Sequence, residues 1–98
     1  MKIIWSPLAI DKTSAIADYI AMNNRSAAEK WIEKVFSKVT LLKESPKMGR
    51  IVPEINKNQF REILYGNYHI IYHIEKDQIS ILTIRHSKQI LPINEIIA

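Results

Sequence analysis

Two histidines, His69 and His73, stand four residues apart in the stretch YHIIYHI at residues 68–74. On a helix this spacing stacks two side chains on one face, where both imidazoles can bind one metal ion. On a strand the same four residues span about 13 Å, whereas zinc binds an imidazole nitrogen at about 2 Å. Isoleucine and tyrosine dominate the stretch, and these residue types favour strands. The sequence therefore argues against a metal site, and no cofactor is predicted.

Side chains alternate between the two faces of a strand, which divides this stretch into two sets. The set that we expect to face the core comprises Tyr68, Ile70, Tyr72 and Ile74. The other set comprises His69, Ile71, His73 and Glu75. His73 is interpreted as a half-exposed polar residue. His69 and His86 remain candidates for chemistry, because neutral histidine accepts a proton near pH 7 and protonated histidine binds phosphate.

Basic residues gather in the C-terminal half of the chain, in or beside the expected strands: Lys47, Arg50, Lys57, Arg61, Arg85 and Lys88. Antiparallel pairing can bring the starts and ends of alternate strands together. The sequence therefore predicts a cationic patch composed of Arg50, Arg61, His69, Arg85 and His86. Such a patch can bind phosphate backbones or an acidic peptide, and the alternative is a solvated face that only keeps the protein soluble. The acidic residues of this half are interpreted as surface charges: Glu54, Glu62 and Asp77.

The chain has 98 residues, which suits a single domain spanning residues 1–98. Its formal net charge of +4 is typical either of a protein that binds anions or of a lysine-rich soluble surface. The absence of cysteine excludes disulfides, thiolate zinc sites and a cysteine nucleophile. The sequence contains no glycine-rich phosphate loop, no secretion signal and no apolar stretch of membrane-spanning length. We therefore expect a soluble cytoplasmic protein without a membrane contact.

The N-terminal half predicts a strand followed by two helices. Residues 2–5 form an apolar strand-like run, and Ser6-Pro7 marks a helix start, because serine caps free N–H groups and proline fits the first turn. The apolar face of this helix comprises Ala9, Ile16, Tyr19 and Ile20. Ser26 is predicted to cap the second helix, whose apolar stripe comprises Ala28, Trp31, Ile32, Val35, Val39 and Leu42. The short connection at Asn23-Asn24 predicts an antiparallel helical hairpin.

The C-terminal half predicts three strands after an irregular region that extends from Ser45 to about Asn58. The strand-like runs are residues 60–65, 68–75 and 79–86. Gly66-Asn67 and Lys76-Asp77 separate them as tight turns. The predicted order is β-α-α-β-β-β. This order is typical of an α+β domain, in which the N-terminal helical hairpin packs on a mostly antiparallel sheet.

Five short motifs occur once each, in this order along the chain: I-W-S-P-x-A at residues 4–9, Leu42-x-x-x-Pro46-x-x-Gly49-Arg50, Arg61-Glu62, Tyr68-x-Ile70-x-Tyr72 and Ile79-x-Ile81-Leu82-x-Ile84-x-His86. With these motifs, residues 3–88 resemble the ParE/RelE superfamily, the toxins of bacterial type II toxin–antitoxin modules, also called plasmid stabilisation modules. The helical hairpin, the P-x-x-G-R segment and the Arg-Glu pair are closer to the ParE-like branch.

The resemblance implies a toxin that is neutralised by a cognate antitoxin. The expected assembly is either a homodimer or a toxin–antitoxin hetero-oligomer. Three functions remain open. A ParE-like protein poisons DNA gyrase by binding, without chemistry of its own. A RelE-like protein cleaves messenger RNA on the ribosome. A degenerate member keeps the fold and antitoxin binding without toxicity.

The resemblance also implies roles for individual residues. As a ribonuclease, the protein would polarise the scissile phosphate and transfer protons through Arg61, His69, Arg85 and His86. As a binding protein, it would contact its target or nucleic acid through Arg50, Arg61, Arg85 and Lys88. His69 stands where the RelE-like branch usually places an arginine, and Lys12-Thr13 stands where Asp-Leu is common.

Overall fold

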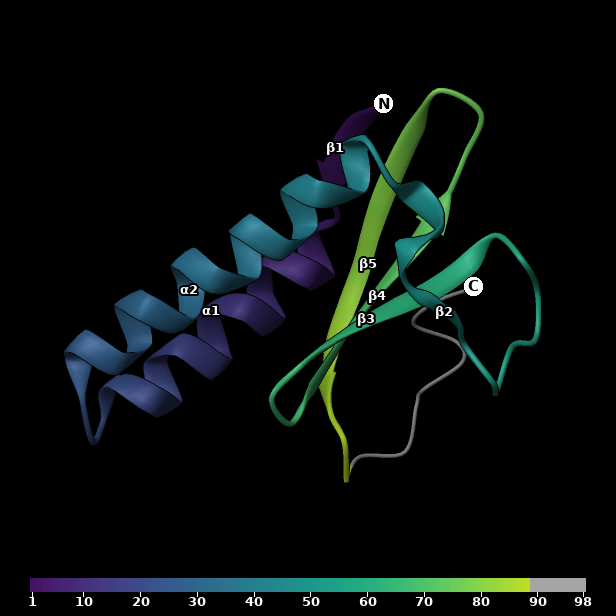
Figure 1. The fold of residues 1–98 in the computed structure, drawn as a ribbon. Coiled ribbons are helices and arrows are strands. Elements are labelled where there is room, and N and C mark those ends of the chain that lie inside the picture. The colour runs from purple at the N-terminus through teal and green to yellow at the C-terminus, as the bar shows by residue number, and fades with distance from the viewer. Residues whose placement is uncertain (89–98) are drawn as a thin grey trace.

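Two helices lie against one face of a five-stranded sheet in the computed structural model, which describes residues 1–88 (Figure 1). The elements in chain order are β1 (Lys2–Trp5), α1 (Pro7–Ala21), α2 (Arg25–Thr40), the short 3-10 helices η1 (Leu41–Lys43) and η2 (Pro46–Met48), β2 (Arg50–Ile51), β3 (Phe60–Tyr65), β4 (Tyr68–Ile74) and β5 (Gln78–His86). The spatial order is β1-β5-β4-β3-β2. β1 lies parallel to β5, and the other neighbours are antiparallel.

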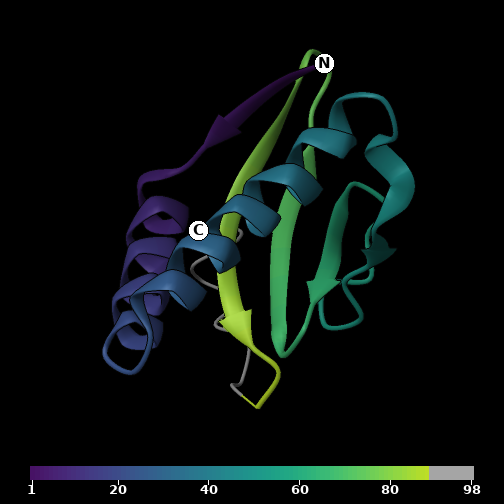
Figure 2. The ribbon, with the colours of Figure 1, turned by 60° about the vertical axis from the view of Figure 1, so that its left-hand side comes forward.

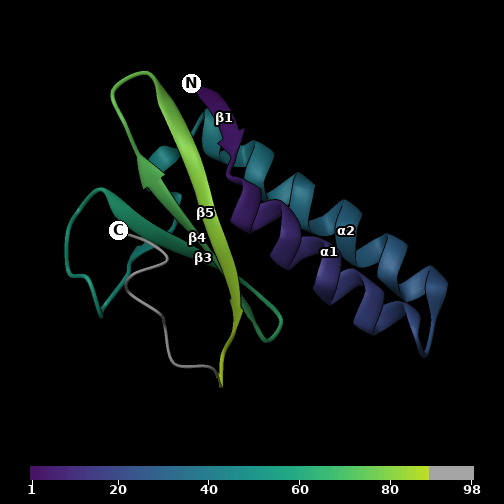
Figure 3. The same cartoon turned by 180° about the vertical axis from the view of Figure 1, so that it is seen from behind.

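The predicted α+β class and the order β-α-α-β-β-β are confirmed, with one addition. The region 45–58, expected to be irregular, contains the two-residue strand β2, which pairs with Glu62 and Arg61 of β3. Figures 2 and 3 show from two further sides that α1 and α2 lie together on one side of the sheet. None of the described helices is long and apolar enough to cross a membrane.

Both helices begin at a polar cap, although only one cap was predicted correctly. Ser6 accepts the backbone N–H of Ala9 at 3.0 Å through its hydroxyl, and Pro7 opens α1 as expected. Asn24, and not Ser26, caps α2, because its side-chain oxygen accepts the N–H of Ala27 at 3.0 Å. Asparagine and serine are both good N-caps, so the sequence alone does not choose between neighbouring candidates.

The hairpin approaches the sheet through small residues of α1 and large residues of α2. Ala9, Thr13 and Ala17 are the buried residues of α1 and recur every four residues, which lets this helix lie close to the sheet. The buried residues of α2 are Ala28, Trp31, Val35 and Val39, as the predicted stripe requires. Tyr19 was assigned to the apolar face of α1, but its side chain is exposed.

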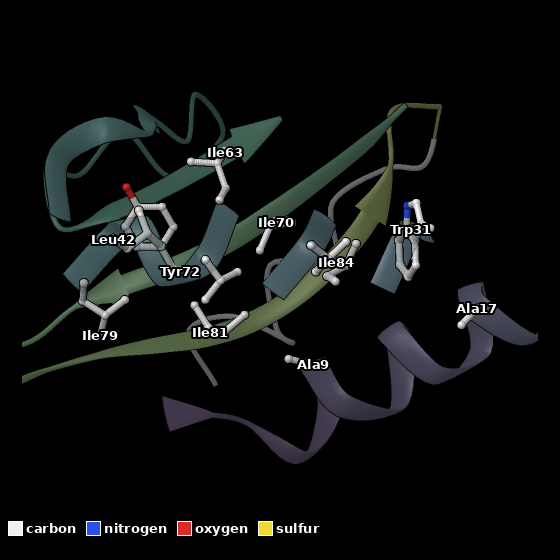
Figure 4. Packing of buried hydrophobic residues seen from close by; sticks show 12 residues of the cluster. Ala9, Ala17, Trp31, Leu42, Ile63, Ile70, Tyr72, Ile79, Ile81 and Ile84 are labelled. Carbon is white, nitrogen blue, oxygen red and sulfur yellow. The ribbon is translucent and has the colours of Figure 1, made fainter. Parts of the chain in front are cut away.

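The core between helices and sheet contains the predicted face of β4. Ile70 and Tyr72 are fully buried there, beside Ile81 and Ile84 of β5 (Figure 4). Tyr68 and Ile74 are partly buried and pack against this cluster. On the opposite face of the sheet, a smaller cluster consists of Val52, Phe60 and Ile71, with Ile55 and Leu82 packed against it.

A β-bulge in β5 changes which residues of this strand face the helices. Ile71 pairs with Thr83 and Tyr72 pairs with Ile81, so Leu82 has no partner in β4. The extra residue shifts the alternation by one position. Ile81 and Ile84 therefore both reach the helix-side core, although they are an odd number of positions apart. The hydroxyl of Ser6 donates to the carbonyl of Leu82 at 2.9 Å and links the start of α1 to the bulge.

Tyr72 fastens the segment before β2 to the middle of the sheet. Its hydroxyl donates to the carbonyl of Pro46 at 2.7 Å and accepts the N–H of Gly49 at 3.0 Å. Burial raises the pKa of Tyr72, although the hydrogen bond from Gly49 and the charge of Arg61 partly oppose this effect. The hydroxyl therefore remains protonated and keeps its donor. A Cβ on Gly49 would lie 2.6 Å from the carbonyl oxygen of Glu62, so the close approach requires glycine.

We predict that Tyr72→Phe lowers the free energy of unfolding by roughly 1–3 kcal/mol, because it removes two hydrogen bonds and leaves the buried Gly49 N–H and the partly buried Pro46 carbonyl without this partner. Urea unfolding followed by tryptophan fluorescence measures the change. Tyr19→Phe is the matched control, since the side chain of Tyr19 is exposed. Equal unfolding midpoints for the two variants would contradict the anchoring role of Tyr72.

Candidate functional site

The sheet brings part of the predicted cationic patch together on the face that points away from the helices. His69 of β4 pairs directly with Arg85 of β5. Arg50 of β2 pairs directly with Glu62 of β3. Cross-strand partners share a face, and the bulge at Leu82 turns Arg85 to the side occupied by His69. Arg50, His69 and Arg85 therefore surround Glu62.

Glu62 is the centre of this group, and its interpretation as a surface charge was wrong. Its side chain is 0% exposed. The carboxylate accepts from Arg50 Nε at 2.7 Å and lies 2.9 Å from His69 Nδ1. Arg85 Nη2 stands 3.8 Å away and also lies 3.4 Å from Glu54. An ionised carboxylate is buried only when charged or hydrogen-bonding partners replace its water.

Both ring nitrogens of His69 have a hydrogen-bond partner. Nδ1 faces Glu62, and Nε2 lies 3.1 Å from the hydroxyl of Ser87, which is 2.9 Å from the carbonyl of Asn67. Acid, histidine and serine in this order resemble the relay of a serine hydrolase. Here the Ser87 hydroxyl can donate to Asn67, and its backbone N–H binds the same carbonyl at 2.7 Å. This series of hydrogen bonds thus ties the end of β5 to the turn between β3 and β4.

Arg61 lies outside this cluster, on the other side of β3 from Glu62. Its guanidinium donates to the carbonyl of Gly49 at 2.9 Å, to that of Lys47 at 3.3 Å and to that of Asn58 at 2.9 Å. It also binds the side-chain oxygen of Asn58. Arg61 therefore clamps the two loops that flank β2, and the structure does not place it with His69 and Arg85.

His86 and Lys88 are also separated from His69. His86 pairs with Tyr68, whose ring it meets edge-on at 5.4 Å, and so it belongs to the helix side of the sheet. It lines a cavity of about 270 Å³ with Lys12, Tyr19 and Tyr68. The Nδ1 atom of His86 accepts the backbone N–H of Lys88 at 3.1 Å, which leaves Nε2 as the hydrogen-bond donor of the neutral ring. The side chain of Lys88 is exposed at the end of β5.

Arg50 is the member of the cluster that reaches solvent. Its side chain is 54% exposed, and Nε makes its one side-chain hydrogen bond within residues 1–88. Both terminal nitrogens, Nη1 and Nη2, are therefore available to a ligand.

His69 and His73, the two histidines spaced four residues apart, make separate contacts. His73 stacks on Phe60 with ring centroids 4.4 Å apart, while His69 joins the Glu62 cluster. Within residues 1–88, no three histidine, aspartate, glutamate or cysteine side chains gather as a metal site would require.

The family profile described as "ParE toxin of type II toxin-antitoxin system, parDE" matches residues 3–91. The chain belongs to the ParE toxin family. A solved structure from the chromosomal ParDE toxin–antitoxin system of P. aeruginosa has the same fold, with a TM-score of 0.71 and 20% sequence identity over 88% of this chain and 95% of that one. No curated protein matches the chain.

Membership in the ParE family confirms the resemblance that the motifs indicated, and the structure explains why two of those motifs occur together. The P-x-x-G-R segment carries Gly49 against Tyr72 and Arg50 against Glu62. The Arg-Glu pair supplies the clamp on one face of β3 and the buried carboxylate on the other. Sequence reasoning found both motifs, but no local pattern indicated that Glu62 is buried.

We predict that Glu62→Gln destabilises this ParE-family protein by about 3 kcal/mol, because an amide has no charge to neutralise Arg50 and Arg85 at a buried position. Chemical unfolding at neutral pH measures the loss. Glu33→Gln on the exposed side of α2 is the control and should change stability by less than about 0.5 kcal/mol. A loss below about 1 kcal/mol for Glu62→Gln would show that the carboxylate is not essential to the cluster.

Proposed function

We propose that this protein is the toxin of a type II toxin–antitoxin pair, that it stops growth by binding and poisoning DNA gyrase, and that its antitoxin neutralises it. The match to the ParE toxin family over residues 3–91 carries the proposal. Gyrase is the target that the ParE-like resemblance implies. On this proposal the protein acts by occupying a surface of its target and needs no catalytic group.

The arrangement of the candidate catalytic residues supports binding over RNA cleavage. A ribonuclease needs a base with a free lone pair and cations that reach the same phosphate. Both ring nitrogens of His69 already have partners, and Arg61 binds four oxygens of neighbouring loops. His86 lies on the other face of the sheet. These groups do not converge on one point.

We predict that the purified protein inhibits supercoiling by gyrase and does not cleave messenger RNA during translation. His86→Gln separates the two functions, because glutamine keeps a hydrogen-bond donor but cannot transfer a proton. Inhibition by this variant should stay within about twofold of the parent protein, as expected for a role without proton transfer. Ribosome-dependent cleavage by the parent protein, together with unchanged supercoiling, would establish the ribonuclease function instead.

The outer side of the helical hairpin supports neutralisation by a protein partner. An apolar groove of about 520 Å³ runs between α1 and α2. Its walls include Ile10 and Phe36, which are 54% and 46% exposed, and Trp5, whose ring lies 4.9 Å from that of Phe36. A monomer gains stability when a partner covers such a surface, and an amphipathic helix fits a groove between two helices. We therefore assign this groove to an apolar helix of the antitoxin.

We predict that Phe36→Asp weakens antitoxin binding by at least tenfold, because a carboxylate would be buried against the apolar face of the partner. Calorimetric titration with the antitoxin measures the affinity, and co-expression measures neutralisation. Lys34→Asp introduces the same side chain on the same helix at a position that does not line the groove. Equal losses for both variants would point to charge alone and would remove the groove from the antitoxin interface.

A further inference from the structure

A further pocket lies at the edge of the sheet, where β2 begins. It has a volume of about 260 Å³ and is lined by Lys38, Met48, Gly49, Arg50, Glu62, Ile63 and Leu64. β2 pairs only with Arg61 and Glu62, so residues 63–65 of β3 have no strand beside them on this edge within the described part of the chain. The backbone of an extended segment can therefore pair with β3 at this position.

Several contacts fix the loop that presents Arg50 to this pocket. Gly49 donates its N–H to the Tyr72 hydroxyl at 3.0 Å, and the same hydroxyl holds Pro46 at 2.7 Å. Arg61 binds the carbonyl of Gly49 from the other side at 2.9 Å. The loop is thus attached to the sheet directly before Arg50. A side chain carried on a fixed loop loses little conformational entropy when it binds a ligand.

The guanidinium of Arg50 is oriented as well as attached. Glu62 accepts from Nε at 2.7 Å and leaves the two terminal nitrogens without a hydrogen bond among the described residues. These nitrogens form the fork that matches the two oxygens of a carboxylate. The negative charge of Glu62 is opposed by two guanidinium groups, those of Arg50 and Arg85, which limits its repulsion of such a ligand. Lys38 supplies a second cation on the wall of the pocket.

We propose that this pocket binds an acidic side chain of an extended segment from a protein partner, with Arg50 as the anchor. The rim favours a peptide over a nucleic acid, since Met48 and Leu64 are 47% and 48% exposed and lie beside the cations. Single-stranded nucleic acids are bound by aromatic platforms and rows of cations, and the lining contains no aromatic ring. Alternating acidic and apolar residues on an added strand would turn every acidic side chain to one face, toward Arg50, and every apolar side chain to the other.

The inference goes beyond the proposed function, which does not identify a residue that contacts the partner through charge. It rests on that function only for the existence of a protein partner. The binding of a peptide to the pocket and the inhibition of gyrase are measured separately on the same preparation. Failure of the titration with intact inhibition therefore refutes the pocket alone, and the reverse result refutes the gyrase proposal alone.

The test is an NMR titration of the isotope-labelled full chain with the peptide acetyl-Val-Glu-Val-Glu-Val-amide. We expect shifts at the Nε–H of Arg50 and at the amides of residues 48–51 and 62–65. The peptide with glutamine in place of both glutamates should bind at least tenfold more weakly. Inorganic phosphate and a thymidine pentanucleotide are the competing anions, and tighter binding of either one to the pocket would overturn the proposal.

Two variants of the protein complete the test. Arg50→Lys keeps a cation beside Glu62 but removes the two terminal nitrogens of the guanidinium. It should weaken binding of the peptide at least tenfold. Lys38→Met leaves the Glu62 cluster untouched and should weaken binding of the peptide at least threefold. This variant still tests the proposal if Arg50→Lys unfolds. Lys30→Met is the matched control on α2, at a position outside the lining, and should bind like the parent. Unchanged affinity in Lys38→Met, or equal shifts with the neutral peptide, would refute the assignment.

Discussion

The burial of one carboxylate, that of Glu62, constrains most of the sheet. Removing an ionised carboxylate from water costs several kcal/mol unless charged partners with good geometry surround it. The partners of Glu62 come from the three other antiparallel strands: Arg50 from β2, His69 from β4 and Arg85 from β5. A shift of any of these strands by one residue would turn its partner to the other face of the sheet. The cluster therefore favours a single register for all of them.

The same constraint explains why a bulge in β5 matters for the site. With unbroken alternation, the strand that buries Ile79 and Ile81 on the helix side would direct Arg85 to that side too. The extra residue Leu82 reverses the alternation, so that Ile84 continues the core while Arg85 reaches Glu62. The cap of α1 supports this irregularity, since the Ser6 hydroxyl that accepts from Ala9 also donates to the carbonyl of Leu82. Helix start, bulge and buried charge cluster are thus physically connected.

The sequence predicted the elements that depend on periodic burial and missed those that depend on tertiary pairing. The apolar stripe of α2 and the core face of β4 follow from spacing alone, and both are confirmed. The predicted cationic patch correctly included His69 and Arg85, which pair directly across two strands. Arg61 and His86 were also assigned to the patch, but their side chains lie on other surfaces. Their directions depend on local alternation and on the bulge, which has no clear composition signal. The burial of Glu62 also escaped notice, because a single acidic residue in a strand resembles a solvated one until its partners are placed.

Arg50 connects the stability of the fold with recognition, since its guanidinium has two usable edges. Nε serves Glu62 inside the protein, while the terminal nitrogens make no hydrogen bond to the described residues and Arg50 lines the pocket. A lysine at this position would supply charge to either side but could not hold two carboxylates in a fixed geometry. Because the buried carboxylate already orders the arginine, a partner that binds the outer edge gains affinity without ordering it again. Such a partner would in turn stabilise the folded chain by mass action, which matters for a small domain with a modest core.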